Sequence, residues 1–330
     1  MLEGLQAIDE IRLNFSPTGL FILNLTISFI MFGVALELKP ENFKRLIQHP
    51  KPALIGGISQ FILMPLMTFI LAIALRNYIT PTIGLGMILV ASCPGGNVSN
   101  FFSSLAKGNV ALSVSLTAIS DLGAILITPF NFAFWGNLFT KVYSLTNASE
   151  LVKPLVIDPI DMFQTVFILL GVPLTLGILF NMKFPKLTSK IIVPIKRLSL
   201  FTFAAIVIIL FANNFDYFIK YIKYIFLIVL VHNGIALSMG YSFASLFKLP
   251  FQDRKTISIE TGIQNSGLAL VLMFNPKIFP PDLAIGGMLF IAAWWGIWHL
   301  LAGFSIAGYW SGFSLKPKKE TSKIITPENF

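Results

Sequence analysis

Apolar stretches recur along the whole chain and are separated by short polar connections. An α-helix needs about 20 predominantly apolar residues to cross the hydrocarbon core of a bilayer. The pattern therefore predicts an all-α membrane protein with about nine transmembrane helices. The predicted spans are 18–38, 52–75, 81–106, 110–136, 159–182, 197–213, 219–247, 252–275 and 281–312.

These spans form a single transmembrane domain over residues 18–313. An N-terminal segment, 1–17, is expected on one side of the membrane, and a tail, 314–330, on the other, because nine is an odd number of crossings. Residues 1–16 lack the basic start and short apolar stretch of a cleaved signal peptide. No separate soluble domain is predicted.

The charged residues fit a membrane domain better than a soluble one. Only 12% of the residues are charged and 55% are hydrophobic, whereas soluble domains carry about 25% charged residues. Most of the 24 lysines and arginines fall in alternate connections, such as 39–51 and 183–197, and in the tail. Cytoplasmic connections hold this excess, so we expect a cell-membrane protein with its N-terminus outside and its C-terminus in the cytoplasm. The net charge of +9 is thereby a topology signal, and no nucleic-acid partner is expected.

The third and eighth predicted spans are interrupted. The third contains Pro94-Gly95-Gly96, which cannot continue a regular helix because proline lacks an N–H donor and glycine carries an entropic cost. The eighth contains the polar run Glu260–Gly267. Interrupted helices in corresponding places of two halves point to the midplane site of a secondary transporter. With one span missing at the front, the positions of the breaks predict an inverted repeat of four and five helices.

Glu260 is the central candidate for chemistry. A carboxylate at the centre of a bilayer costs about 2.5–3.5 kcal/mol on insertion scales, so it normally has a partner or a function. No lysine or arginine lies near the centre of a neighbouring span. A bound cation is therefore the expected partner. The alternative is a protonated acid that is hydrogen-bonded between helices.

A set of oxygen ligands accompanies Glu260. Ser113, Thr117 and Asp121 recur every four residues on the fourth span and share one helix face. The break in the eighth span frees backbone carbonyls. The candidate ligands are Gln60, Ser99, Asn100, Ser113, Thr117, Glu260, Gln264 and the carbonyls of Thr261 and Ile263. Oxygen ligands around one firm negative charge suit sodium better than a transition metal.

The half-helices that follow the two breaks are expected to attract an anion, because helix N-termini present free N–H groups and the positive end of a dipole. Asn97, Asn265 and Ser266 lie where a substrate carboxylate could be held. His299, in the last span, either lines the same cavity or is structural. Asp121 has three alternative roles: it tunes the neighbouring sodium site, carries a proton, or stays protonated and inert.

The motifs of common membrane-embedded enzymes are absent from the sequence, including His-Glu-x-x-His and Gly-x-Gly-Asp. We therefore expect no enzymatic activity.

The motifs that are present resemble those of the bile acid:sodium symporter family. The resemblance covers about residues 24–310 and rests on six stretches, Met31–Gly33, Gln60–Pro65, Cys93–Asn100, Gly108–Ser113, His232–Gly234 and Glu260–Gly267. It implies the family fold of two inverted five-helix repeats, with core and panel domains and two discontinuous crossing helices. The family has ten helices and this chain has nine predicted spans, so the first family helix is expected to be absent here.

The resemblance also implies two sodium sites that share Glu260. The first would use Ser99, Asn100, Ser113, Thr117 and Glu260, and the second would use Gln60, Glu260, Gln264 and the carbonyls of Thr261 and Ile263. The implied function is sodium-coupled uptake of an organic anion, bile-acid-like or a small carboxylate, by a monomer through alternating access.

Three residues depart from the family pattern, and two of them, Asn97 and Leu300, lie in the region where the substrate is expected to bind. Asn97 stands where the family has a threonine, and Leu300 follows His299 where an asparagine is expected. Asp121 replaces a hydroxyl residue.

Two other functions remain open at this point. An exporter or a sodium/proton exchanger of related fold is matched superficially by Cys93 and Glu260. A non-transporting membrane receptor would bind the anion without net flux.

Overall fold

The computed structural model describes residues 2–9, 17–36, 48, 50–146, 158–213, 215–275, 277–280 and 283–312. Within these ranges the chain consists of helices and turns, with one isolated pair of bridged residues. The predicted all-α fold is confirmed for this part of the chain. The predicted tail, 314–330, lies outside the described residues.

The helices follow one another closely along the chain. Their bounds are α1 (Leu2–Asp9), α2 (Pro17–Ala35), α4 (Pro50–Ile58), η1 (Ser59–Leu63), α5 (Met64–Ala74), α6 (Pro81–Ser92), α7 (Ser99–Leu105), α8 (Val110–Thr146), α9 (Pro159–Val166), η2 (Phe167–Gly171), α10 (Val172–Lys183), α11 (Pro185–Asn213), α12 (Phe215–Leu246), α13 (Phe251–Gly262), α14 (Ser266–Met273) and α15 (Gly286–Ser311). The η1 and η2 segments are π-helical turns inside longer helices.

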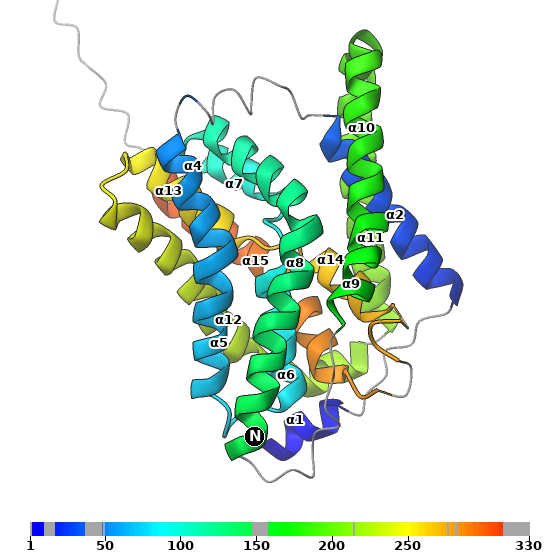
Figure 1. Ribbon diagram of the computed structural model, residues 1–330, viewed down its shortest axis with the longest axis vertical. Helices are drawn as coiled ribbons and strands as arrows, with labels where there is room; N and C mark the ends of the chain where they lie inside the picture. Colours follow the sequence, from blue (N-terminus) through cyan, green and yellow to red (C-terminus); the bar gives the residue numbers. More distant parts are fainter. Residues whose placement is uncertain are drawn as a thin grey trace, which may run out of the picture.

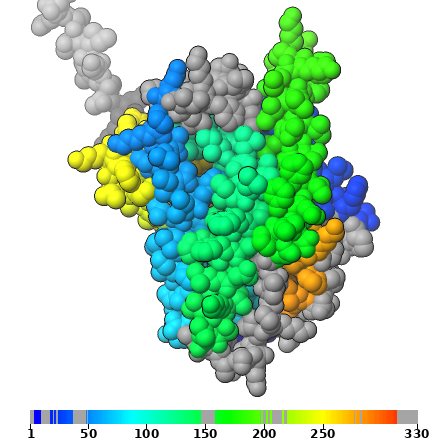
Figure 2. Space-filling view, in the orientation of Figure 1, coloured from blue at the N-terminus to red at the C-terminus, as the bar shows by residue number. Residues whose placement is uncertain are grey.

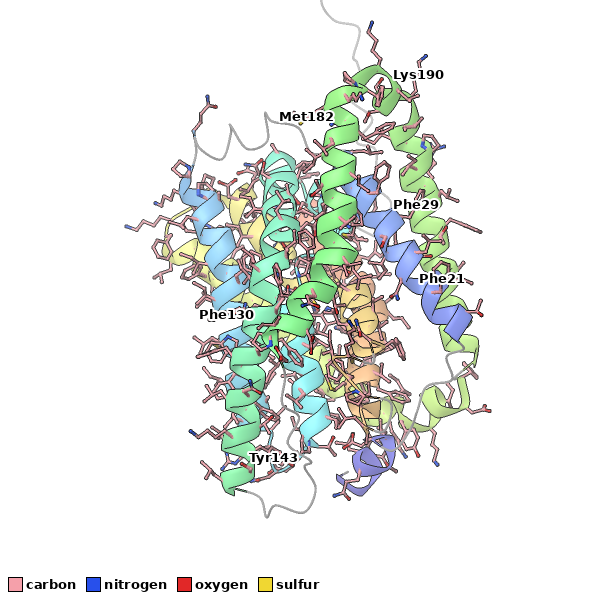
Figure 3. The ribbon with its side chains drawn as sticks, turned by 45° about the vertical axis from the view of Figure 1, so that its right-hand side comes forward. Phe21, Phe29, Phe130, Tyr143, Met182 and Lys190 are labelled. Atoms are coloured by element: carbon pink, nitrogen blue, oxygen red, sulfur yellow. The ribbon has the colours of Figure 1, made fainter. Side chains whose placement is uncertain are left out.

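Five helices in the described ranges are long and apolar enough to cross a bilayer. They are Pro50–Ala74, Val110–Leu145, Pro159–Lys183, Ile219–Leu246 and Gly286–Ser311, and the shorter Asn24–Ala35 and Pro81–Ser92 are also apolar. Large apolar side chains such as Phe21 and Phe130 are exposed and point away from the body of the protein in Figure 3, as expected of a lipid-facing surface. The count of nine crossings and the inverted repeat remain predictions.

Two helices extend beyond the spans that hydrophobicity predicts. Helix α11 begins at Pro185 rather than near 197, and α8 continues to Thr146 rather than ending near 136. A helix need not end at the membrane surface, and proline is well tolerated in a first turn. Figure 3 shows Lys190 at one end of the bundle and Tyr143 at the other.

Helices α2, α10 and α11 pack on one another along one side of the molecule, as Figure 1 shows. Helix α10 approaches α2 closely at Gly177, where an added Cβ would lie 2.5 Å from the Cβ of Ala35. The other long helices form the larger body. This grouping is in keeping with a panel and a core, and that division stays a prediction.

The short helix α1 packs against α12 and α15, which the apolar spans alone did not indicate. Its Leu5 and Ile8 are fully buried. Asp9 accepts hydrogen bonds from Thr80, over 3.0 Å, and from Thr82 at the start of α6. Residues 2–9 of the predicted external segment therefore cover one end of the helical body.

The π-helical turn η1 has a local cause in the sequence. Pro65 has no N–H, so the carbonyl of Phe61 loses its helical donor. Asn131 of α8 supplies the missing hydrogen bond through its Nδ2 atom, over 2.8 Å. Such widened turns are frequent at functional sites, and this one carries Gln60.

Candidate functional site at the two helix breaks

The two predicted interruptions are present, and they lie against each other. Helices α6 and α7 are the halves of the third predicted span, and α13 and α14 are the halves of the eighth. Gly96 N–H donates to the carbonyl of Ile263 over 2.6 Å, and Asn265 N–H donates to the carbonyl of Pro94 over 2.9 Å. Backbone that leaves a helix at membrane depth needs such partners. Each break therefore satisfies polar groups of the other.

Glycine is required where the breaks meet. A Cβ at Gly96 would lie only 3.1 Å from the carbonyl oxygen of Gln264. Gly95 N–H donates to Ser120 Oγ of α8 over 2.7 Å. The Pro-Gly-Gly sequence thus ends α6 and also permits the close approach of the second broken helix.

The carboxylate of Glu260 lies in a cage of hydroxyl groups. Its Oε1 accepts hydrogen bonds from Ser99 Oγ of α7, over 2.7 Å, and from Ser113 Oγ of α8. Its Oε2 accepts from Thr117 Oγ1 over 3.1 Å. Asn100 Oδ1 lies 3.3 Å from the same Thr117 oxygen. The structure therefore brings together the five residues that the resemblance implies for the first sodium site.

The residues implied for the second sodium site also meet at the break. Gln60 Nε2 donates to Gln264 Oε1 over 2.8 Å, and Gln264 Nε2 donates to the carbonyl of Thr261 over 2.7 Å. The carbonyl of Ile263 accepts the Gly96 N–H. Because a carbonyl oxygen has two lone pairs, it keeps one for an ion.

The donor set fits a hard monovalent cation. The atoms around Glu260 are hydroxyl, amide and carbonyl oxygens. In the described part of the chain, no three His, Cys, Asp or Glu side chains are grouped as a transition metal would require. A small pocket between α4–η1 and α8 reaches Glu260 and is lined by Gly57, Gln60 and Ser120 among others. Figure 2 shows these helices side by side on the facing surface.

The residues expected to hold a substrate are only partly brought together. Asn265 Oδ1 accepts the Leu268 N–H over 3.0 Å and so caps α14. Ser266 lies against α15, where a Cβ added at Gly296 would be 2.8 Å from its Oγ. His299 of α15 interacts with the backbone of Gln264. Asn265, Ser266 and His299 therefore surround the same break.

Asn97 and Asp121 have no such attachments. The Asn97 Oδ1 atom and both carboxylate oxygens of Asp121 are buried without a hydrogen-bond partner among the described residues. Asn97 directly follows the first break and Asp121 lies on α8, but no hydrogen bond in the described part of the chain assigns either of these oxygen groups a role.

Three further polar side chains, those of Ser59, His232 and Asn233, support the breaks and were not among the predicted site residues. Asn233 of α12 donates to the carbonyl of Gly262, the last residue of α13, over 2.7 Å. Ser59 and Thr261 share a hydrogen bond of 2.8 Å. His232 bonds Thr68 over 2.7 Å. Each is a polar residue inside an apolar span, and this feature of the sequence could have identified them.

Lys255 holds the two half-helices of the Glu260 site together from one end. Its Nζ donates to the carbonyl of Ala106, at the end of α7, over 2.9 Å and lies 4.4 Å from the centre of the Phe251 ring. The side chain is only 5% exposed. Since α7 carries Ser99 and α13 carries both Lys255 and Glu260, this contact fixes the spacing of the site.

We expect Lys255→Met to lower the melting temperature and to weaken sodium binding. A hydrogen bond from a charged group contributes about 1.5–3 kcal/mol, and its loss leaves the Ala106 carbonyl unpaired. Lys190→Met is the matched control, because Lys190 is exposed at the tip of α11. Sodium titrations followed by thermal unfolding measure both effects. Equal behaviour of the two variants would contradict the role given to Lys255.

Known proteins resemble this chain over most of its length. Residues 24–221 match the model of the sodium bile acid symporter family. The sodium-dependent transporter YocS of Bacillus subtilis, which is described as uncharacterised, is 34% identical over 97% of this chain and 94% of its own length. A probable sodium/metabolite cotransporter of rice chloroplasts, BASS2, is 30% identical over 84% of this chain and 64% of its own length. The human sodium/bile acid cotransporter 4 is 28% identical over 78% of this chain and 56% of its own length.

The resemblance drawn from the motifs is therefore confirmed. The names of these three relatives all refer to sodium, and the apolar helices described above belong to a multi-pass membrane protein. The chain belongs to the sodium bile acid symporter family of sodium-dependent transporters.

Proposed function

We propose that this protein is a secondary active transporter that takes up an organic anion together with sodium by alternating access. The observation that carries the proposal is the position of Glu260. Its carboxylate is held by hydroxyl groups from α7 and α8, directly beside the point where two broken helices meet. A negative charge in this place needs a cation to balance it.

Two sodium ions would share Glu260. One ion would bind between Ser99, Ser113 and Thr117 and would tie α7 and α8 to α13. The other would bind beside Gln60 and Gln264, at the bridged backbone. In the structure, hydrogen bonds already hold these oxygens within reach of one another. Sodium would therefore bind first and stabilise the meeting point of the breaks.

The anion would bind beside the N-terminus of α14. Helix N-termini favour negative charge, and Ser266 begins this helix next to His299 of α15. The amide nitrogen of Asn97 is a further candidate, because Asn97 directly follows the first break and its Nδ2 group can donate to a carboxylate. The names of the relatives mention two classes of substrate, bile acids and metabolites. Both classes are organic anions in this proposal.

Alternating access would come from movement of the larger helical body against the α2–α10–α11 group. The packing of these three helices on one another supports such a unit. The protein would act as a monomer in the cell membrane, with its N-terminus outside and its C-terminus in the cytoplasm, as the lysine and arginine distribution predicts.

A thermal-shift screen of the purified protein tests the proposal. Bile acids and short carboxylates are added in sodium chloride and, separately, in potassium chloride. We expect sodium alone to raise the melting temperature, because a ligand at about 100 times its dissociation constant stabilises a protein by about 2.7 kcal/mol. At least one anion should raise it further, and only in sodium. An anion that stabilises equally in both salts would count against sodium coupling.

Flux measurements separate this function from its alternatives. In proteoliposomes, an inward sodium gradient should drive uptake of the anion found in the screen, and an internal unlabelled pool should accelerate counterflow. A receptor would bind the anion and show neither. Cys93→Ala should retain full uptake, whereas loss of activity in that variant would favour the cysteine-dependent exporter.

A further inference from the structure

Asp121 is a second buried carboxylate in the body of the protein, and the proposed function gives it no role. The residue is fully buried on α8. Neither of its carboxylate oxygens has a hydrogen-bond partner among the described residues. Glu260, by contrast, accepts hydrogen bonds from three hydroxyl groups. The two carboxylates therefore have opposite surroundings.

Asp121 lies on the face of α8 that points toward the breaks. Thr117, one turn earlier, donates to Glu260. Thr128, two turns later, donates to the carbonyl of Ser92, the last residue of α6, over 2.7 Å. Residues spaced in this way share one side of a helix. The carboxyl group of Asp121 is also close enough to Glu260 for their charges to interact.

A carboxylate without donors is costly in a dry interior, so it needs a proton or a cation. The charge balance of the proposed sodium site favours a cation over a proton as the partner of Asp121. Before the anion binds, two sodium ions at Glu260 alone would leave one positive charge unbalanced inside the protein. A second carboxylate beside the first would bring this sodium-loaded, substrate-free site to zero net charge. The oxygens of Asp121 are the unused ligands that could do so.

We propose that Asp121 is an additional sodium ligand, so that the two ions taken up by the breaks are balanced by two carboxylates. The inference rests on the proposed function and deepens it. The proposed cation site then includes Asp121 in addition to Glu260 and the hydroxyl groups around it. The second charge strengthens the binding of sodium before any anion arrives.

Asp121→Asn is the decisive variant, because asparagine has nearly the shape of a protonated aspartic acid. Binding of radioactive sodium and sodium-dependent thermal stabilisation are measured on the purified protein without substrate. We expect sodium affinity to fall by about tenfold or more, equivalent to about 1.4 kcal/mol, and the number of bound ions to fall from two to one. Ser115→Ala is the control, since Ser115 is buried on the same helix and bonds the carbonyl of Ala111 in its own helix.

The outcomes separate this inference from the proposed function. Unchanged sodium affinity and stoichiometry in Asp121→Asn would show an inert protonated acid and overturn the inference. If Glu260→Gln loses sodium binding while Asp121→Asn keeps it, the proposed function stands and only the role of Asp121 fails. If neither variant affects sodium, both fail. Should the asparagine variant not fold, Asp121→Ser is measured in its place against the same expectation.

Discussion

Glu260→Gln is expected to remove sodium-dependent uptake and the stabilisation of the protein by sodium. The substitution keeps the length and shape of the side chain but removes the only charge in the cage formed by Ser99, Ser113 and Thr117. Both proposed sodium ions use this carboxylate, so both should be lost together. The melting temperature of the variant in sodium should equal its melting temperature in potassium.

The stability of the variant without sodium is a separate measurement. Glutamine retains an acceptor oxygen for one side of the cage, but its amide nitrogen cannot accept the hydrogen bond that Oε2 now receives from Thr117. Asp216→Asn is the matched control, because Asp216 is an exposed carboxylate in the first turn of α12. Sodium-dependent uptake that persists in Glu260→Gln would exclude the ion site proposed here.

Gly86→Ala is expected to destabilise the protein strongly for so small a change. Helices α6 and α15 pack so closely at Gly86 that an added Cβ would lie 2.6 Å from the Cα of Met288. The contact is with main chain, so no side chain can rotate away and the helices must separate. Overpacking of this kind costs about 1–3 kcal/mol, and occasionally more. Thermal unfolding of the purified variant measures the loss.

The same substitution at Gly308 provides the comparison. Gly308 lies on α15, and a Cβ there meets nothing within 4 Å. Replacing glycine by alanine inside a helix normally stabilises it by about 0.5–1 kcal/mol. Gly308→Ala should therefore match or exceed the parent protein. A Gly86→Ala variant as stable as Gly308→Ala would mean that α6 and α15 pack less closely than described. Uptake should also fall in Gly86→Ala, because α6 leads into the first break and α15 carries His299.

The site could be predicted from the sequence because polar residues are rare inside membrane-spanning segments. Glu260, Gln60 and the Pro94-Gly95-Gly96 break all interrupt apolar spans, where each must have a partner. Hydrophobicity therefore located the broken helices and the oxygen ligands, and the structure brings these ligands to one place. The assignment of Asn97 and His299 to a substrate site stays a prediction, because the shape of a binding cavity depends on tertiary packing that no local pattern encodes.

Features that depend on tertiary contact could not be predicted in this way. Lys255 stands at the polar end of a span, where a lysine normally signals topology rather than a hydrogen bond to α7. Pro65 marks the π-helical turn that carries Gln60, but the donor that satisfies the Phe61 carbonyl is Asn131, 70 residues away in the sequence. Helix α1 was overlooked because its apolar face is short. The end of α8 and the start of α11 could not be predicted from hydrophobicity, because both helices continue beyond their apolar spans.

The bridge between the two breaks has an evolutionary consequence. Its two bonds, from Gly96 to Ile263 and from Asn265 to Pro94, join main chain to main chain. The side chain of Asn97, next to Gly96, takes no part in these two bonds. Under the proposed function, a mutation beside the bridge would change the accepted ligand and leave the sodium coupling of a descendant intact. One scaffold of this kind would then suit relatives named for bile acids and relatives named for metabolites.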